Sequence, residues 1–189
     1  MSNCGNNSGD SFHQQLDLAR NFIRPLSVDR QNLRTAIISV SDGFKIIQDL
    51  KVTTSNSTVV SLESPSSAGL CTFGRGLEAT GKMFKTKGMK GVPQLVIVLL
   101  AGKPSDDVSK PANDLHRAGV LVYSVGLKKT INASTVINLP SDPVAEYFLS
   151  FPDFAAVDST KQALLNKMNR GFLNTFILFK NRILQFLSL

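Results

Sequence analysis

The sequence predicts an α/β domain with a doubly wound, mostly parallel sheet and one antiparallel hairpin at its edge. Residues 94–100 form a run that is apolar at every position after Gln94, which is typical of a parallel strand covered on both faces. A helical segment and a second strand-like run, residues 120–125, follow it, and Gly119 lies between them, where a helix end favours a left-handed residue. Strand and helix patterns alternate along most of the chain, which indicates α/β architecture.

The elements before this central unit are a helix and a hairpin. Residues 12–23 place apolar side chains at three- and four-residue spacings after a Ser11 cap, which predicts one helix packed on the sheet. Residues 33–40 and 44–50 read as strands, and the turn signal at 41–43 makes them antiparallel neighbours.

The remaining elements are predicted from composition and spacing. Seven segments are assigned: a connector or short helix at 52–63, a loop at 64–69, a helix at 73–87, a helix start at 105–109, a short helix at 135–138, a strand at 146–151 and a closing helix at 154–169. Asp106 and Asp107 lie near a helix start, where carboxylates oppose the helix dipole favourably.

The chain divides into one domain and two flanking segments. Residues 12–170 form the domain, residues 1–11 are polar, and residues 171–189 form an apolar tail interrupted by Lys180 and Arg182. The tail is too short and too charged for a membrane span, so it reads as an interfacial helix or as an appended sticky segment.

Composition and charge narrow the classes of partner. The 189 residues carry a formal net charge of +7, with the lysines and arginines scattered. The densest group follows one predicted helix and is expected to be its solvated face: Lys82, Lys85, Lys87 and Lys90. Only Phe84 lies among these lysines, so no base-stacking platform and no nucleic-acid partner are predicted.

The sequons and the first residues bear on the compartment of the chain, whereas its two cysteines do not reveal it. Cys4 and Cys71 are too few for a disulfide framework and lack metal-ligand spacing. Because no histidine partner can be named for Cys71, it is expected to be a packed or idle thiol. Three sequons would accept N-glycans on the secretory route, at Asn6, Asn56 and Asn132. Residues 1–10 lack signal-peptide character, which predicts a cytoplasmic location for the chain as written.

The sequence contains no complete catalytic motif. Gly76–Lys82 match the first seven positions of a phosphate-binding P-loop, but Met83 stands where Ser or Thr would ligate magnesium, and Gly76 is expected inside a helix. His13 and His116 fall on predicted helices, as exposed or capping residues, without catalytic partners at a recognisable spacing. The chain is therefore predicted to be no enzyme and to hold no cofactor.

Two longer segments carry a family resemblance. Residues 92–102, with the sequence VPQLVIVLLAG, and residues 112–126 closely resemble a von Willebrand factor A domain. Within that family, they are most similar to the amino-terminal modules of type VI collagen chains. The resemblance extends over residues 12–169. It implies adhesion and assembly in the extracellular matrix, with matrix or cell-surface proteins as partners.

The resemblance also implies where a metal would bind. Family members that use a metal hold it with an Asp-x-Ser-x-Ser loop, a later Thr and a final Asp. Carried onto this chain, these positions fall near Asn3, Gly5 and Asn7, near Cys71, and on Ala101. None offers a charged ligand, so no metal is predicted.

The family's central first strand also has no counterpart, because residues 1–11 are polar and rich in Gly and Asn. These observations predict a non-enzymatic, metal-independent protein-interaction module, consistent with a fragment or the product of a decayed gene. The alternative is a cytosolic or membrane-surface protein whose basic body and tail, residues 171–189, associate with anionic lipid.

Overall fold

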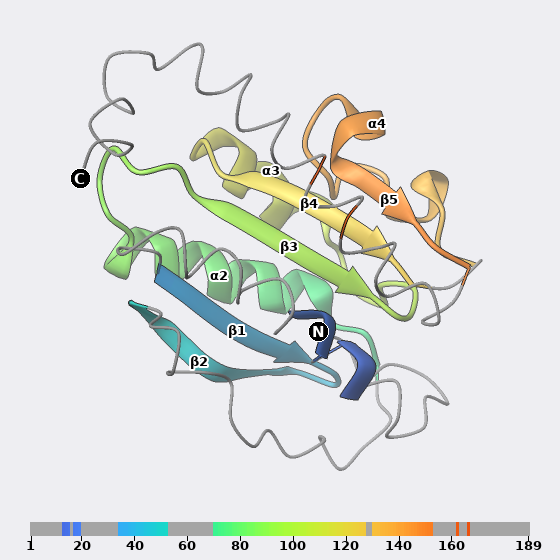
Figure 1. The fold of residues 1–189 in the computed structure, drawn as a ribbon, viewed down its shortest axis with the longest axis horizontal. Coiled ribbons are helices and arrows are strands. Elements are labelled where there is room, and N and C mark those ends of the chain that lie inside the picture. The colour runs from blue at the N-terminus through green and yellow to red at the C-terminus, as the bar shows by residue number, and fades with distance from the viewer. Residues whose placement is uncertain are drawn as a thin grey trace.

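A computed structural model describes residues 13–15, 17–19, 34–52, 70–127, 130–152, 162 and 166. The first described residues, 13–15 and 17–19, are helical. The elements that follow, shown in Figure 1, are β1 (Arg34–Val40), β2 (Phe44–Val52), α2 (Phe73–Lys87), β3 (Leu95–Leu100), α3 (Ser109–Arg117), β4 (Leu121–Gly126), a 3-10 helix (Ala133–Val136), α4 (Val144–Tyr147) and β5 (Phe148–Ser150).

The strands form two sheets. In one, β3, β4 and β5 are parallel, with Leu95 opposite Leu121 at the start of the first pair. In the other, β1 and β2 are antiparallel across the 41–43 turn, which confirms the predicted hairpin. No strand among the described residues joins β1 to β3 (Figure 1). The parallel sheet, its helices and the antiparallel hairpin confirm the predicted fold class.

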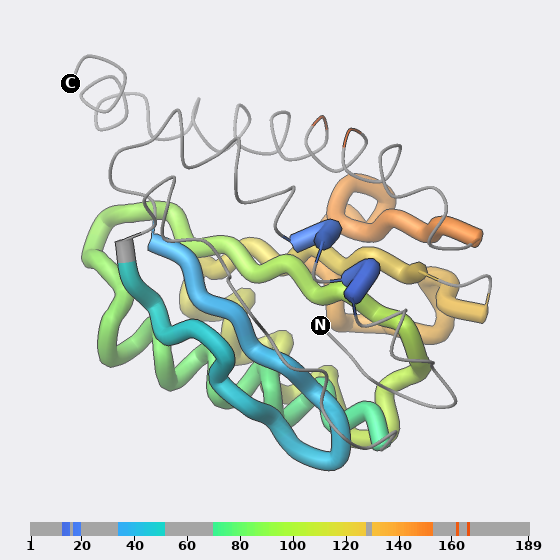
Figure 2. The backbone as a smooth tube through the Cα atoms, turned by 60° about the horizontal axis from the view of Figure 1, so that its bottom comes forward, coloured from blue at the N-terminus to red at the C-terminus, as the bar shows by residue number. Residues whose placement is uncertain are grey.

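Both faces of the parallel sheet are covered. Val98 and Leu100 of β3 join a buried cluster with residues of α2 and α3, whereas Leu99 joins a second cluster that includes Leu18. Figure 2 shows α2 and α3 on one side of the strands and the helical residues 13–15 and 17–19 on the other. This alternation explains the continuous apolar run of β3, because a strand covered on both faces turns consecutive side chains into two cores.

Two element predictions need correction. The predicted strand 146–151 is wrong at its first two residues, because Val144–Tyr147 is helical and the strand begins at Phe148. The helical turn brings the Tyr147 ring to a centroid distance of 4.8 Å from the buried Tyr123, a tertiary contact that strand spacing does not reveal.

The predicted short helix 135–138 lies earlier, at Ala133–Val136. Asn132 caps it, since its Oδ1 accepts a hydrogen bond from the Thr135 amide at 3.1 Å.

Several predictions fall on residues that the structure does not describe. They concern the segments 1–11, 53–69 and 171–189, and, except for the helical residues 162 and 166, the closing helix. Within the described residues, no helix combines the length and apolar character that crossing a bilayer requires.

Candidate functional site

Three connections meet at one end of the molecule, and we call them together the loop edge: residues 41–43, 70–72 and 101–108. Backbone hydrogen bonds join them, because the Thr72 amide donates to the Ser41 carbonyl at 3.1 Å and the Ser105 amide donates to the Cys71 carbonyl at 3.0 Å. The Thr72 hydroxyl adds a second bond to the Ser41 carbonyl at 2.8 Å. The carboxyl end of a parallel strand, here β3, is where doubly wound sheets place their ligand sites.

Two of the predicted metal-site positions lie in the loop edge. Ala101 is fully buried, and its methyl group supplies no ligand atom. Cys71 has 6% exposure and is disulfide-bonded, so the prediction of a packed thiol is wrong. The other predicted positions, Asn3, Gly5 and Asn7, lie outside the described residues, as do Cys4 and the sequons at Asn6 and Asn56.

An acidic side chain of the loop edge anchors the amino end of α2. The Asp106 carboxylate accepts hydrogen bonds from the Gly74 amide at 2.9 Å and from the Arg75 amide at 3.0 Å. These two amides belong to the first turn of the helix, which lacks intrahelical partners for its N–H groups. The side chain at the helix's own cap position, Thr72, makes no capping bond, so Asp106 caps α2 from the loop that follows β3.

Glycine at position 74 makes this contact possible. A β-carbon there would collide with the Asp107 carbonyl oxygen and would lie 2.9 Å from Asp106 Oδ2. The sequence prediction assigned the two aspartates to the helix start that follows them in the chain. That is correct for Asp107, whose Oδ1 accepts from the Ser109 amide at 2.9 Å, but it missed the anchoring of α2 by Asp106.

The remaining acidic side chain of the loop edge is also engaged with the backbone. Asp42 Oδ1 accepts a hydrogen bond from the Leu70 amide, which ties the hairpin turn to the segment before α2. The described residues contain no group of three or more His, Cys, Asp or Glu that could hold a metal ion. The three carboxylates of the loop edge are already hydrogen-bonded to backbone amides, and the family's first-loop positions, Asn3, Gly5 and Asn7, are not among the described residues.

The P-loop-like segment Gly76–Lys82 and the two histidines, which were considered for catalysis, lie in helices. Gly76 is within α2, as predicted, and a β-carbon there would lie 2.7 Å from Val40 Cγ2, so this glycine serves close helix-to-strand packing. His13 is exposed. His116 is half-buried rather than exposed, and its Nε2 is buried without a hydrogen-bond partner. Burial lowers the pKa of His116, and this effect outweighs the raising effect of the negative charge of Asp142.

The described sequon lies on the surface. Asn132 is exposed, and its Oδ1 accepts from the Ser134 hydroxyl at 2.6 Å as well as from Thr135. The four lysines of the predicted solvated face are also exposed, which confirms that prediction.

Comparison with known families decides the class of the domain. The model of the von Willebrand factor type A domain matches residues 3–163. The chain belongs to this family. Its resemblance to von Willebrand A domains, inferred above from the central unit, is thereby confirmed.

Relatives of this von Willebrand A domain include cuticlin-6 of Caenorhabditis elegans, 26% identical over 144 residues that cover 74% of the chain and 25% of the relative. The human collagen alpha-6(VI) chain is 21% identical over 184 residues, covering 94% of the chain and 8% of the relative. The chain thus spans a quarter or less of these relatives.

Solved structures share the fold. Proximal thread matrix protein 1 from the mussel byssus has a TM-score of 0.77 at 15% identity, covering 89% of this chain and 46% of that one. A structure of the same byssus protein with a zinc-occupied MIDAS motif has a TM-score of 0.74 at 16% identity, with the same coverage of 89% and 46%. Manganese-loaded Plasmodium vivax TRAP has a TM-score of 0.63 at 16% identity, covering 84% and 68%.

Proposed function

We propose that this von Willebrand A domain is a non-enzymatic module that binds other proteins without a metal ion. The observation that carries the proposal is the chemistry of the loop edge. Ala101 is buried and has no ligand atom, and the carboxylates of Asp42, Asp106 and Asp107 accept hydrogen bonds from backbone amides. A divalent cation would have to compete with these bonds for its oxygen ligands.

The proposed setting is the extracellular matrix, with matrix or cell-surface proteins as partners. The relatives include type VI collagen chains of human and mouse and matrilin-2 of mouse. The disulfide at Cys71 supports this setting independently, because disulfides form and persist in oxidising compartments such as the secretory route. The relatives are far longer than this chain, so its role within an assembly is part of the proposal.

The loop edge also carries an apolar surface suited to a protein partner. Leu70 is 65% exposed, and the neighbouring hairpin strand adds Phe44 and Ile46, each nearly half exposed. Phe44 and Ile46 are two positions apart in β2, so their side chains point to the same face of the strand. Exposed apolar side chains at such a position favour contact with a protein surface over contact with water.

The test is binding of the purified chain to immobilised matrix proteins, including triple-helical collagen, in EDTA and in millimolar Mg²⁺ or Mn²⁺. We expect saturable binding that is equal in the three buffers and weakened by the double substitution Phe44→Ser/Ile46→Ser. The control is Ile137→Ser, which removes an exposed apolar side chain from a different segment. Binding abolished by EDTA would refute metal independence, and absence of binding to every matrix protein would refute the assigned partner class.

A further inference from the structure

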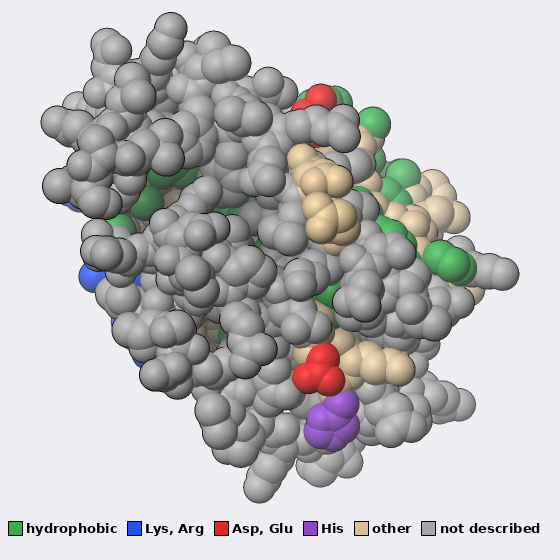
Figure 3. All heavy atoms as spheres, viewed as in Figure 1, with side chains coloured by type: hydrophobic (Ala, Val, Ile, Leu, Met, Phe, Trp, Pro, Cys, Tyr) green, Lys and Arg blue, Asp and Glu red, His purple; other side chains and the backbone are tan. Residues whose placement is uncertain are grey.

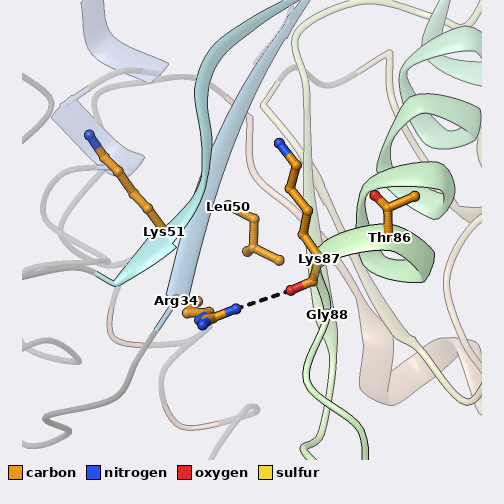
Figure 4. A pocket seen from close by; sticks show the side chains of 6 residues that line it. All are labelled: Arg34, Leu50, Lys51, Thr86, Lys87 and Gly88. Carbon is orange, nitrogen blue, oxygen red and sulfur yellow. Dashed lines mark hydrogen bonds between the residues drawn. The ribbon is translucent and has the colours of Figure 1, made fainter.

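A basic groove lies at the carboxyl end of α2, at the opposite end of that helix from its anchor to the loop edge. Its lining comes from three elements, namely the start of β1, the end of β2 and the end of α2, and comprises Arg34, Leu50, Lys51, Thr86, Lys87 and Gly88. The volume of the groove is about 510 Å³, and the groove is largely open to solvent. Figure 4 shows Lys51 and Lys87 extending in a similar direction on the two sides of Leu50, with Arg34 next to the end of α2.

The charges of the groove are poorly balanced. Lys51 is exposed and forms no ion pair with any described residue. Lys87 pairs with Asp49, and this hydrogen bond lowers the pKa of the carboxyl. Asp49 is the one acidic side chain that pairs with a lining residue within the described structure.

Two further cations flank the groove along the chain. Lys85 and Lys90 lie two residues before Lys87 and two residues after Gly88, and both are exposed without an ion pair to a described residue. In Figure 3, Lys and Arg side chains appear at the left edge of the molecule, where Figure 1 places the end of α2. Among the described residues, the lining thus carries three positive charges against the single carboxylate of Asp49, in a chain whose net charge is +7.

The helix end does not cancel this positive field. The last carbonyl groups of a helix carry partial negative charge and would repel an anion. Here Arg34 Nη1 donates a hydrogen bond to the Lys87 carbonyl at 3.1 Å, and the Gly88 amide donates to the Phe84 carbonyl at 2.8 Å. The other N–H groups of the exposed guanidinium remain available to a ligand.

We propose that this groove binds a sulfated polysaccharide chain of the glycosaminoglycan type. Sulfate groups are permanent anions that suit the guanidinium fork and the lysine ammonium groups. An open groove admits a linear polymer, and its lining contains one apolar side chain and no aromatic ring. Sites for single-stranded nucleic acids combine basic side chains with aromatic rings on which bases stack, and this lining has no such ring, so it favours the polysaccharide over a single strand.

Heparin serves as the probe. We expect the chain to elute from immobilised heparin at high salt, and the triple substitution Arg34→Ala/Lys51→Ala/Lys87→Ala to weaken binding roughly tenfold, since each exposed charge pair contributes modestly. The matched control removes three exposed cations elsewhere, as Lys103→Ala/Lys110→Ala/Arg117→Ala, with the same change in net charge. Equal weakening by the two triple variants would overturn the proposal, because binding would then follow net charge alone.

A second variant, Asp49→Asn, is expected to raise the affinity for heparin, and it leaves Arg34 in place. Asp49→Asn releases Lys87 from its internal partner, so heparin should bind more tightly than to the unmodified chain. Asp114→Asn removes one exposed carboxylate from α3 and is the matched control, with no change beyond the effect of one unit of charge. Equal gains for the two variants, or equal affinity for chemically desulfated heparin or for duplex DNA of similar charge, would contradict a sulfate-binding groove.

Discussion

The anchoring of α2 by Asp106 can be tested by removing its carboxylate. Asp106→Ala deletes two charge-assisted hydrogen bonds, to the Gly74 and Arg75 amides, and leaves these first-turn amides without a protein partner. Loss of a helix cap costs about 1 kcal/mol, and loss of a negative charge from the amino end of the helix dipole adds about 0.5 kcal/mol. The free energy of unfolding should therefore fall by about 1.5 kcal/mol, which corresponds to roughly 3 to 6 °C in melting temperature for a domain of this size.

Urea denaturation followed by circular dichroism measures this change directly. Asp106→Asn retains one acceptor oxygen and should lose about half as much stability as the alanine variant. The control is Asp114→Asn, because Asp114 is exposed and its contact with Arg117 spans 3.8 Å, a surface pair of little energetic weight. If Asp106→Ala unfolds at the same urea concentration as the unmodified chain, the anchor does not hold the loop edge together.

The same anchor makes a steric demand on its neighbour. Gly74→Ala would drive a methyl group into the Asp107 carbonyl and toward Asp106, so it should destabilise the domain at least as much as removal of the carboxylate. Gly43→Ala is the matched control, because a β-carbon at that position meets no atom within 4 Å. Equal stability of the two alanine variants would show that the loop withdraws from α2 at little cost.

Three further predictions concern the disulfide, a histidine and the sequon. Because the chain has two cysteines, an intramolecular bond at Cys71 requires Cys4, and peptide mapping without reductant should yield those two peptides linked, whereas free thiols at both positions would contradict the bond. Burial lowers the pKa of His116 below the ordinary histidine value of 6.5, so the unfolded state binds more protons just below that pH. The free energy of unfolding should therefore fall as pH drops through this window, and His116→Gln should lose that part of the pH dependence. Expression through the secretory route should glycosylate Asn132, and Ser134→Ala should remove the glycan, seen as a mass change on glycosidase treatment, while keeping the asparagine that caps the 3-10 helix.

The sequence predicts the central unit well because its signals are local. The apolar run of β3 follows from burial on both faces, and Gly119 has the positive φ of 77° expected where α3 ends. The helix predicted at 73–87 agrees with α2 at both ends. What sequence reasoning missed depends on contacts between distant segments: the cap that Asp106 provides is 32 residues from Gly74 along the chain, and the helical turn before β5 places Tyr147 on Tyr123.

The proposed metal independence follows from how charge is balanced at the loop edge. In a site where carboxylates from several loops converge on a cation, removing the cation leaves like charges facing one another, at a cost in stability. Here each of Asp42, Asp106 and Asp107 accepts a hydrogen bond from a backbone amide, so each carboxylate is stabilised by a group that cannot dissociate. The loops that the family holds together through a metal would then keep their arrangement in a chelator, and a partner that recognises this surface would bind equally with and without divalent cations.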